Sequence, residues 1–166
     1  MGCGESAERG RLESGLRILS NGIMAVVHKS VFLGYSAAQM FALVDKVEEY
    51  PAFLPWCGGV DIKLREANRL VAAITIHYHG VRQSFTTENT NTPPTGMHMK
   101  LVEGPFKHLD GQWQFKPLRD DACKIEFQLH YEFSSKLLEK LIGPVFNMIA
   151  NSFVESFCKR AEAVYG

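Results

Sequence analysis

The sequence predicts one α+β domain in which a curved antiparallel sheet wraps around a long C-terminal helix. Apolar and polar residues alternate with a period of two along most of the chain after Val60. Short turns separate the alternating segments, which is typical of antiparallel strands with one face in water. Residues 134–165 carry a broad apolar stripe at helical spacing, and such a helix must be covered by another element.

Length and composition support one domain and exclude some classes of function. The chain has 166 residues, enough to bury a sizeable core without disulfides or metals. Lys plus Arg and Asp plus Glu both number 18, so no net charge attracts DNA or an anionic surface. The four cysteines show no C-x-x-C spacing, and we expect reduced thiols in a cytoplasmic protein. No run of 18 apolar residues is present, so we expect no membrane span.

Residues 1–23 precede the patterned sequence, which begins at Met24. They lack the apolar core of a secretory signal. The first six residues fit the M-G-x-x-x-S myristoylation pattern, with Cys3 as a second acylation site, but the motif is too short to outweigh a simpler interpretation. We predict a disordered or wrongly assigned N-terminal extension over residues 1–23 and a folded domain over residues 24–166.

The first predicted elements are a strand and two helices. Ala25–Leu33 is rich in β-branched residues and predicts the first strand. Ser36 followed by Gln39 forms a capping box, which predicts the start of a helix. Pro51 ends this helix near Tyr50 and can open a short second helix.

Six alternating strands and one long helix follow. The last strand, from Cys123 to Phe133, has the cleanest alternation. Ser135 is a plausible N-cap for the helix, and Gly143-Pro144 is where the helix can bend or break. The order is therefore strand, two helices, six strands and a long helix. This is the helix-grip arrangement, with a seven-stranded antiparallel sheet.

Several runs of residues resemble one protein family. The runs are Tyr35–Met40, Tyr50–Cys57, Val102–Leu109 and Trp113–Phe115. They resemble the bacterial RatA-type family, which is similar to mitochondrial coenzyme Q-binding proteins and lies in the START-like (polyketide cyclase-like, SRPBCC) superfamily. The resemblance extends from Met24 to Tyr165. Family members usually begin at the residue matching Met24, which favours a wrongly assigned start.

The resemblance implies two functions of different classes. One is non-catalytic binding of ubiquinone or a related isoprenoid lipid, which supports respiration and implies transient contact with the inner membrane. The other is that of a toxin of a toxin–antitoxin pair, which binds the large ribosomal subunit and inhibits translation. A third function, a polyketide cyclase-like enzyme, follows from fold analogy alone.

A ligand cavity is predicted between the inner face of the sheet and the helix, with open space beside Trp113 and Phe146. Aromatic side chains also fill ordinary cores, so a solidly packed interior is the alternative. Tyr78, Gln83, Thr87 and Tyr131 are candidate partners for a ligand head group. The predicted ligand-binding residues are the large side chains expected to face inward: Phe53, Leu54, Trp56, Ile76, Tyr78, Phe85, Met99, Phe106, Trp113, Phe115, Phe127, Tyr131, Phe146, Ile149 and Phe153.

Catalytic and metal-binding motifs are missing from the sequence. It contains no G-x-S-x-G elbow, H-E-x-x-H motif or P-loop. A cyclase would need an acid or base in the cavity, and the only inward candidates are Tyr78, Tyr131 and Cys123. His77 and His79 share an outward face, but two ligands alone do not predict a metal site. We expect no enzyme activity, no metal and no cofactor other than the bound lipid.

The distribution of basic residues in the sequence does not predict a nucleic-acid interface. They fall in turns or on the water-facing side of the sheet, and acidic residues are interspersed among them. The basic residues concerned are Arg65, Arg69, Arg82, Lys100, Lys107, Lys116, Arg119 and Lys124. We expect no DNA binding, whereas ribosome association through protein contacts is left open.

Overall fold

The computed structural model describes residues 13–19 and 22–166. Within these ranges the strands are β1 (Glu13–Leu19), β2 (Gly22–Leu33), β3 (Cys57–Arg65), β4 (Arg69–Tyr78), β5 (Val81–Thr92), β6 (Gly96–Glu103), β7 (Phe106–Arg119) and β8 (Ala122–Phe133). The helices are α1 (Ala37–Asp45), the 3-10 helix η1 (Val47–Glu49), α2 (Tyr50–Phe53) and α3 (Lys136–Tyr165).

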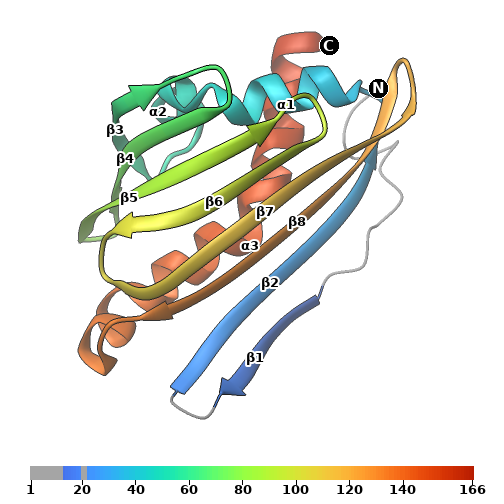
Figure 1. Ribbon diagram of the computed structural model, residues 1–166. Coiled ribbons are helices and arrows are strands. Elements are labelled where there is room, and N and C mark those ends of the chain that lie inside the picture. Colours follow the sequence, from blue (N-terminus) through green and yellow to red (C-terminus); the bar gives the residue numbers. More distant parts are fainter. Residues whose placement is uncertain (1–12, 20–21) are drawn as a thin grey trace.

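The predicted helix-grip fold is confirmed. The strands form one antiparallel sheet in the order β1-β2-β8-β7-β6-β5-β4-β3, and this sheet curves around α3 (Figure 1). Helices α1 and α2 close the end of the sheet where the C-terminal part of α3 lies. The Tyr165 hydroxyl donates to the Gln39 carbonyl oxygen at 3.0 Å, which ties the end of α3 to α1.

The sheet has one strand more than the sequence predicted. Glu13–Leu19 forms β1 and pairs with β2 from Glu13–His28 to Leu19–Gly22. This pairing contradicts the prediction of disorder for Glu13–Leu19, whereas the wrongly assigned start predicted over residues 1–23 stays a prediction. Apolar and polar residues alternate only over Leu16–Ile18 of this segment, so periodicity alone does not predict the strand. Residues 1–12, with the acylation motif, lie outside the described residues.

Helix starts follow the predicted caps. The Gln39 N–H donates to Ser36 Oγ at 3.1 Å, and the Ser36 N–H donates to Gln39 Oε1 at 2.9 Å. At the start of α3 the Leu138 N–H donates to Ser135 Oγ at 3.1 Å. These contacts satisfy backbone donors that the first turn of a helix leaves without partners.

Helix α3 runs without a break through Pro144, although it changes direction along its length in Figure 1. By length and composition alone α3 could cross a membrane, contrary to the expectation from the sequence. In the fold it is the central helix, and 44% of its most apolar window is buried. Contact with the rest of the fold therefore accounts for part of its hydropathy.

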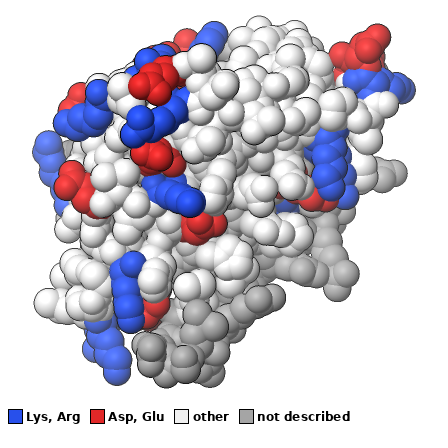
Figure 2. Space-filling view, viewed as in Figure 1, with Lys and Arg blue, Asp and Glu red and all other residues white. Residues whose placement is uncertain are grey.

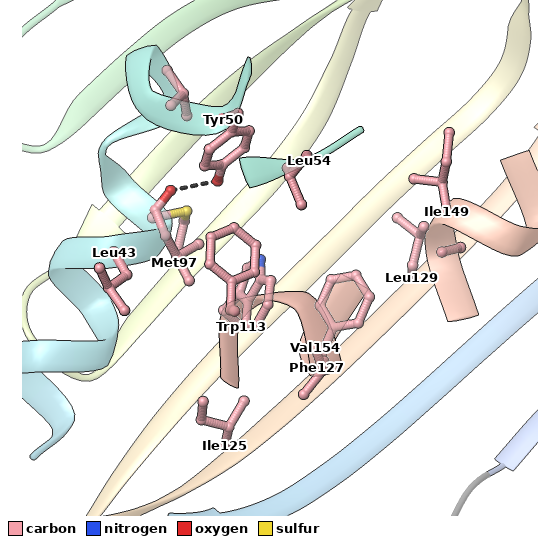
Figure 3. Close-up of a cluster of buried hydrophobic side chains, with 14 of the residues drawn as sticks. Leu43, Tyr50, Leu54, Met97, Trp113, Ile125, Phe127, Leu129, Ile149 and Val154 are labelled. Carbon is pink, nitrogen blue, oxygen red and sulfur yellow. Dashed lines mark hydrogen bonds between the residues drawn. The ribbon is translucent and has the colours of Figure 1, made fainter. Parts of the chain in front are cut away.

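One end of the interior is filled by aromatic rings. Trp113 and Phe115 are fully buried, and their rings stack at 5.7 Å. The Trp113 ring also lies 4.6 Å from Phe127 and 5.6 Å from Phe157 of α3. Figure 3 shows Trp113 and Phe127 pointing into a space that side chains from other elements also enter. Close packing of this kind leaves no room for a ligand.

Candidate functional site

A cavity of about 60 Å³ lies between the inner face of the sheet and α3. Its walls come from η1, α2 and the residues after it, strands β4 to β8, and α3. Phe85, Met99 and Phe153 line it and are only partly buried, so the hollow reaches the surface beside them. The cavity is thus an opening in the interior beyond the packed aromatic end.

Part of the predicted site lines this cavity. Phe146 and Ile149 of α3 lie on one side, and Phe85 of β5 lies across from them, with its ring 6.2 Å from that of Phe146. The predicted residues found in the lining are Trp56, Phe85, Met99, Phe127, Phe146, Ile149 and Phe153. Their role in holding a ligand stays a prediction.

The remaining predicted residues lie elsewhere. Trp113 and Phe115 are fully buried in the packed end, so the space expected beside Trp113 and Phe146 exists only beside Phe146. Phe106 stacks on Phe133 at 5.0 Å, and Tyr78 stacks on His79 at 4.1 Å. The predicted residues outside the lining are Phe53, Leu54, Ile76, Tyr78, Phe106, Trp113, Phe115 and Tyr131.

The prediction also missed residues that do line the cavity. Some are small, and Ala72 and Ala150 leave space where a larger side chain would fill it. Because the prediction selected large side chains, it favoured residues that fill space over those that leave it open. The missed lining residues are Val47, Tyr50, Ala72, Ile74, Asn89, Leu109, Leu129 and Ala150, with Thr87 foreseen only as a head-group partner.

Polar groups enter the cavity from β5. Thr87 and Asn89 line the cavity and are 5% exposed, at alternate positions that continue the inward face of Phe85. The Thr87 hydroxyl donates to Asn89 Oδ1 at 3.3 Å. Alternation alone could have predicted Asn89, which lies two residues beyond Thr87 on the same face of the strand.

Gly104 packs against β5, the strand that carries Phe85, Thr87 and Asn89. It has a φ of +151°, and a Cβ at this position would lie 2.7 Å from the Phe85 Cβ. Only glycine accepts both that conformation and that close approach. The absence of a side chain at Gly104 therefore lets the backbone pack closely against Phe85 at the cavity edge.

The cavity offers no group suited to proton transfer. Among the described residues, its lining holds no carboxylate, imidazole, amine, guanidinium or thiol. Its tyrosine, Tyr50, donates its hydroxyl to the Val44 carbonyl oxygen at 2.5 Å, and burial raises the pKa of Tyr50 far above its ordinary value. Cys123 lies in the packed end, and burial raises the pKa of its thiol to about 11. The arrangement suits binding of an apolar molecule.

A second hollow, of about 160 Å³, lies beside the N-terminal half of α3. It is lined partly by polar groups, including Glu132, Glu139 and Tyr131. The Tyr131 hydroxyl donates to Asn147 Oδ1, and burial raises the pKa of Tyr131 to about 12. Across residues 13–19 and 22–166, no group of three or more His, Cys, Asp or Glu could hold a metal ion.

Comparison with known proteins identifies the family. The ribosome association toxin RatA of Vibrio cholerae serotype O1 is 43% identical over 143 residues, which cover 86% of this chain and 99% of that protein. The chain belongs to the RatA family. Residues 33–158 also match the broader family described as polyketide cyclase / dehydrase and lipid transport. The family predicted from sequence is therefore confirmed.

More distant relatives of this RatA-family chain differ in their named functions. The mitochondrial coenzyme Q-binding protein COQ10 homolog B of Xenopus laevis is 28% identical over 142 residues, covering 83% of this chain and 58% of that protein. The crystal structure of an aromatase/cyclase from Streptomyces sp. R1128 has a TM-score of 0.69 at 16% identity, covering 84% of this chain and 94% of that one. The latter likeness establishes the START-like fold alone.

Proposed function

We propose that the protein binds an apolar ligand, ubiquinone or a related isoprenoid lipid, in the cavity between the sheet and α3, and does not transform it. The observation that carries this proposal is the apolar lining, which opens to the surface beside Phe85, Met99 and Phe153. The likeness to a protein named for coenzyme Q binding supports the same ligand class. Bound ubiquinone would be cargo in support of respiration.

Apolar contact would supply most of the affinity. Burying one CH₂ group contributes about 0.8 kcal/mol, so each five-carbon isoprene unit contributes several times that amount. A head-group hydrogen bond adds a net ~0.5–1.5 kcal/mol. The tail would therefore set affinity, and the head group would set orientation.

The size of the cavity sets a condition on binding. At about 60 Å³ it is smaller than engineered cavities of about 150 Å³ that admit benzene. A quinone ring therefore enters only if side chains at the opening move outward. Met99 is suited to this movement, because it is unbranched and only partly buried.

Binding without catalysis agrees with the chemistry of the lining. Cyclases need an acid or base beside the substrate, and none lies among the described lining residues. The inward candidates named from the sequence, Tyr78, Tyr131 and Cys123, all lie outside the cavity. Enzymes of this fold exist, so an assay for cyclisation belongs beside the binding assay.

Organic extraction of purified protein tests the proposal. We expect mass spectrometry of the extract to find a quinone or isoprenoid lipid, and protein stripped of lipid to bind added ubiquinone. A protein that is empty after purification and does not bind added ubiquinone would refute the proposal.

Ribosome association is the second candidate, favoured by the 43% identity to a protein named ribosome association toxin over nearly its whole length. The described surface gives it little electrostatic support. Blue and red residues are interspersed on the face shown in Figure 2. Arg65 lies 2.7 Å from Glu48, and Lys116 and Lys124 lie within 3.2 Å of Glu126, so carboxylates neutralise much of the positive charge locally.

A sucrose gradient of cell lysate tests this second function. We expect added protein to co-sediment with the large ribosomal subunit and to shift joined ribosomes toward free subunits. Lys107→Glu with Lys116→Glu should weaken only this contact, because both side chains are exposed and outside the cavity. Unchanged ribosome profiles without co-sedimentation would end this interpretation.

As part of the lipid-binding proposal, we infer transient contact with the inner membrane. The protein would then be cytoplasmic and peripheral at that membrane. Leu137 and Leu141 are 67% and 60% exposed on α3, with exposed Lys136 and Lys140 beside them. Apolar and lysine side chains together suit an anionic lipid surface. We expect the protein to pellet with phosphatidylglycerol vesicles, and Leu137→Glu with Leu141→Glu to abolish pelleting. Absence of pelleting by the unmodified protein would contradict membrane contact.

A further inference from the structure

We propose that Trp56, Thr87 and Asn89 form a polar subsite in the cavity, which selects apolar ligands carrying a neutral acceptor oxygen, such as a carbonyl. This inference rests on the proposed function, because it concerns the same cavity. It adds the chemical class of the ligand's polar group and predicts which apolar molecules bind poorly.

Buried polar side chains are concentrated on one strand. Among the residues whose side chains the structure describes, the buried polar ones are Thr86, Thr87, Asn89 and Asn91, all on β5. A buried hydroxyl or amide without a partner costs about 1–3 kcal/mol. Two of the four, Thr87 and Asn89, lie in the cavity wall.

The hydrogen bonds within the cavity leave donors unsatisfied. The Asn89 carbonyl oxygen accepts from Thr87, but the Asn89 amide nitrogen contacts only the Met97 sulfur, at 3.7 Å. A thioether is a weak acceptor, and the amide carries two N–H groups. The indole N–H of Trp56, another lining residue, is buried without any partner.

An acceptor placed in the cavity would pair with these donors. A ligand carbonyl or ether oxygen supplies one, whereas a pure hydrocarbon leaves these donors unpaired. A carboxylate or phosphate would lose its hydration, and no described Lys, Arg or His lines the cavity to offset that loss. The cavity thus favours neutral oxygen-bearing molecules over both hydrocarbons and anionic lipids.

Asn91 belongs to the scaffold of this subsite. Its amide nitrogen donates to Asp45 Oδ1 at 3.0 Å, which connects β5 to the end of α1. The Asn91 amide nitrogen is thus paired within the protein, and its Oδ1 is buried without a partner, but Asn91 does not line the cavity, whereas Asn89 and Trp56 do. The Asn91 amide therefore has a structural role, whereas the Asn89 amide, two residues earlier on β5, is available to a ligand.

Calorimetric titration of the full chain with three probes tests the subsite. The probes share a decyl tail: decylubiquinone carries neutral oxygens, decylbenzene carries none, and undecanoate is anionic. We expect decylubiquinone to bind most tightly. Thr87→Val with Asn89→Leu should weaken decylubiquinone binding about tenfold and leave decylbenzene binding unchanged or tighter.

Two further variants keep the test decisive. Thr86→Val removes a buried hydroxyl next to the subsite but outside the cavity, so it should leave all three affinities unchanged. Trp56→Phe keeps an aromatic ring and removes the N–H together with part of the indole, so decylbenzene reports the change in cavity size. If the double variant does not fold, Trp56→Phe should still weaken decylubiquinone binding more than decylbenzene binding.

The outcomes separate this inference from the proposed function. If all three probes bind equally, or if the variants keep the preference for decylubiquinone, the subsite is wrong and apolar binding stands. If no probe binds, the proposed function fails and the subsite fails with it.

Discussion

The two ends of the interior differ in how completely side chains fill the space between the sheet and α3. At the packed end, Trp113, Phe115 and Phe157 are fully buried and in ring contact. At the cavity end, Ala72 and Ala150 lie among larger residues and leave about 60 Å³ open. The comparison teaches that aromatic side chains occur in both halves of the grip, whereas small and polar side chains mark the half that holds the site.

The largest expected effect comes from the packed end. Trp113→Ala removes a fully buried ring that contacts Phe115, Phe127 and Phe157, and it should lower the free energy of unfolding by about 3–5 kcal/mol. Urea denaturation monitored by circular dichroism measures this loss. A loss below about 1 kcal/mol would show that this end is not solidly packed.

Alkaline pH should destabilise the fold through Tyr131. Burial raises its pKa to about 12 from an ordinary 10.0, so between these values the unfolded chain releases a proton that the folded chain retains. Stability is therefore intact below about pH 10 and falls above it by up to ~1.4 kcal/mol per pH unit. The slope should be smaller in Tyr131→Phe, while Tyr50 still contributes in both proteins. Equal slopes in denaturation series from pH 8 to 12 would contradict this origin.

A matched pair of substitutions on α3 compares the two ends directly. Ala150 lines the cavity, whereas Ala161 is fully buried outside it. Ala150→Val should fill open space with little change in stability and should block ligand entry. Ala161→Val should cost about 1–3 kcal/mol through overpacking. Equal costs for the two variants in urea denaturation would mean that the cavity is not open in solution.

The smallest expected effect on stability comes from Tyr50, whose ring lines the cavity. Tyr50→Phe removes the hydroxyl that donates to the Val44 carbonyl oxygen (Figure 3), and it should cost about 1 kcal/mol. Ligand affinity should hold, because the ring that lines the cavity is kept. Thermal unfolding measures the first effect, and titration with decylubiquinone measures the second. A clear loss of affinity would assign the hydroxyl to the ligand.

The strands after Val60 could be predicted from sequence, because a half-buried antiparallel sheet leaves a period of two in the chain. The Ser36 and Ser135 caps were predictable for a similar reason, since capping depends on neighbouring residues. The continuity of α3 through Pro144 was not, because local sequence marks where a helix can break but not whether tertiary packing holds it together.

The site was only partly predictable. Alternation identifies which side chains face inward, and Phe85, Phe146 and Ile149 were found in this way. It does not say which inward side chains touch each other, because that depends on the curvature of the sheet and the position of α3. Trp113 was therefore assigned to the ligand, although neighbouring rings already fill the space around it.

Intermolecular nuclear Overhauser effects between bound decylubiquinone and methyl-labelled protein test the central claim most directly. The cavity end offers methyl groups of Leu129 and Ile149, and the packed end offers those of Ile125 and Val44. The account predicts contacts from the decyl tail to Leu129 and Ile149 and none to Ile125 or Val44. Contacts confined to Ile125 and Val44, or to surface methyl groups, would contradict it.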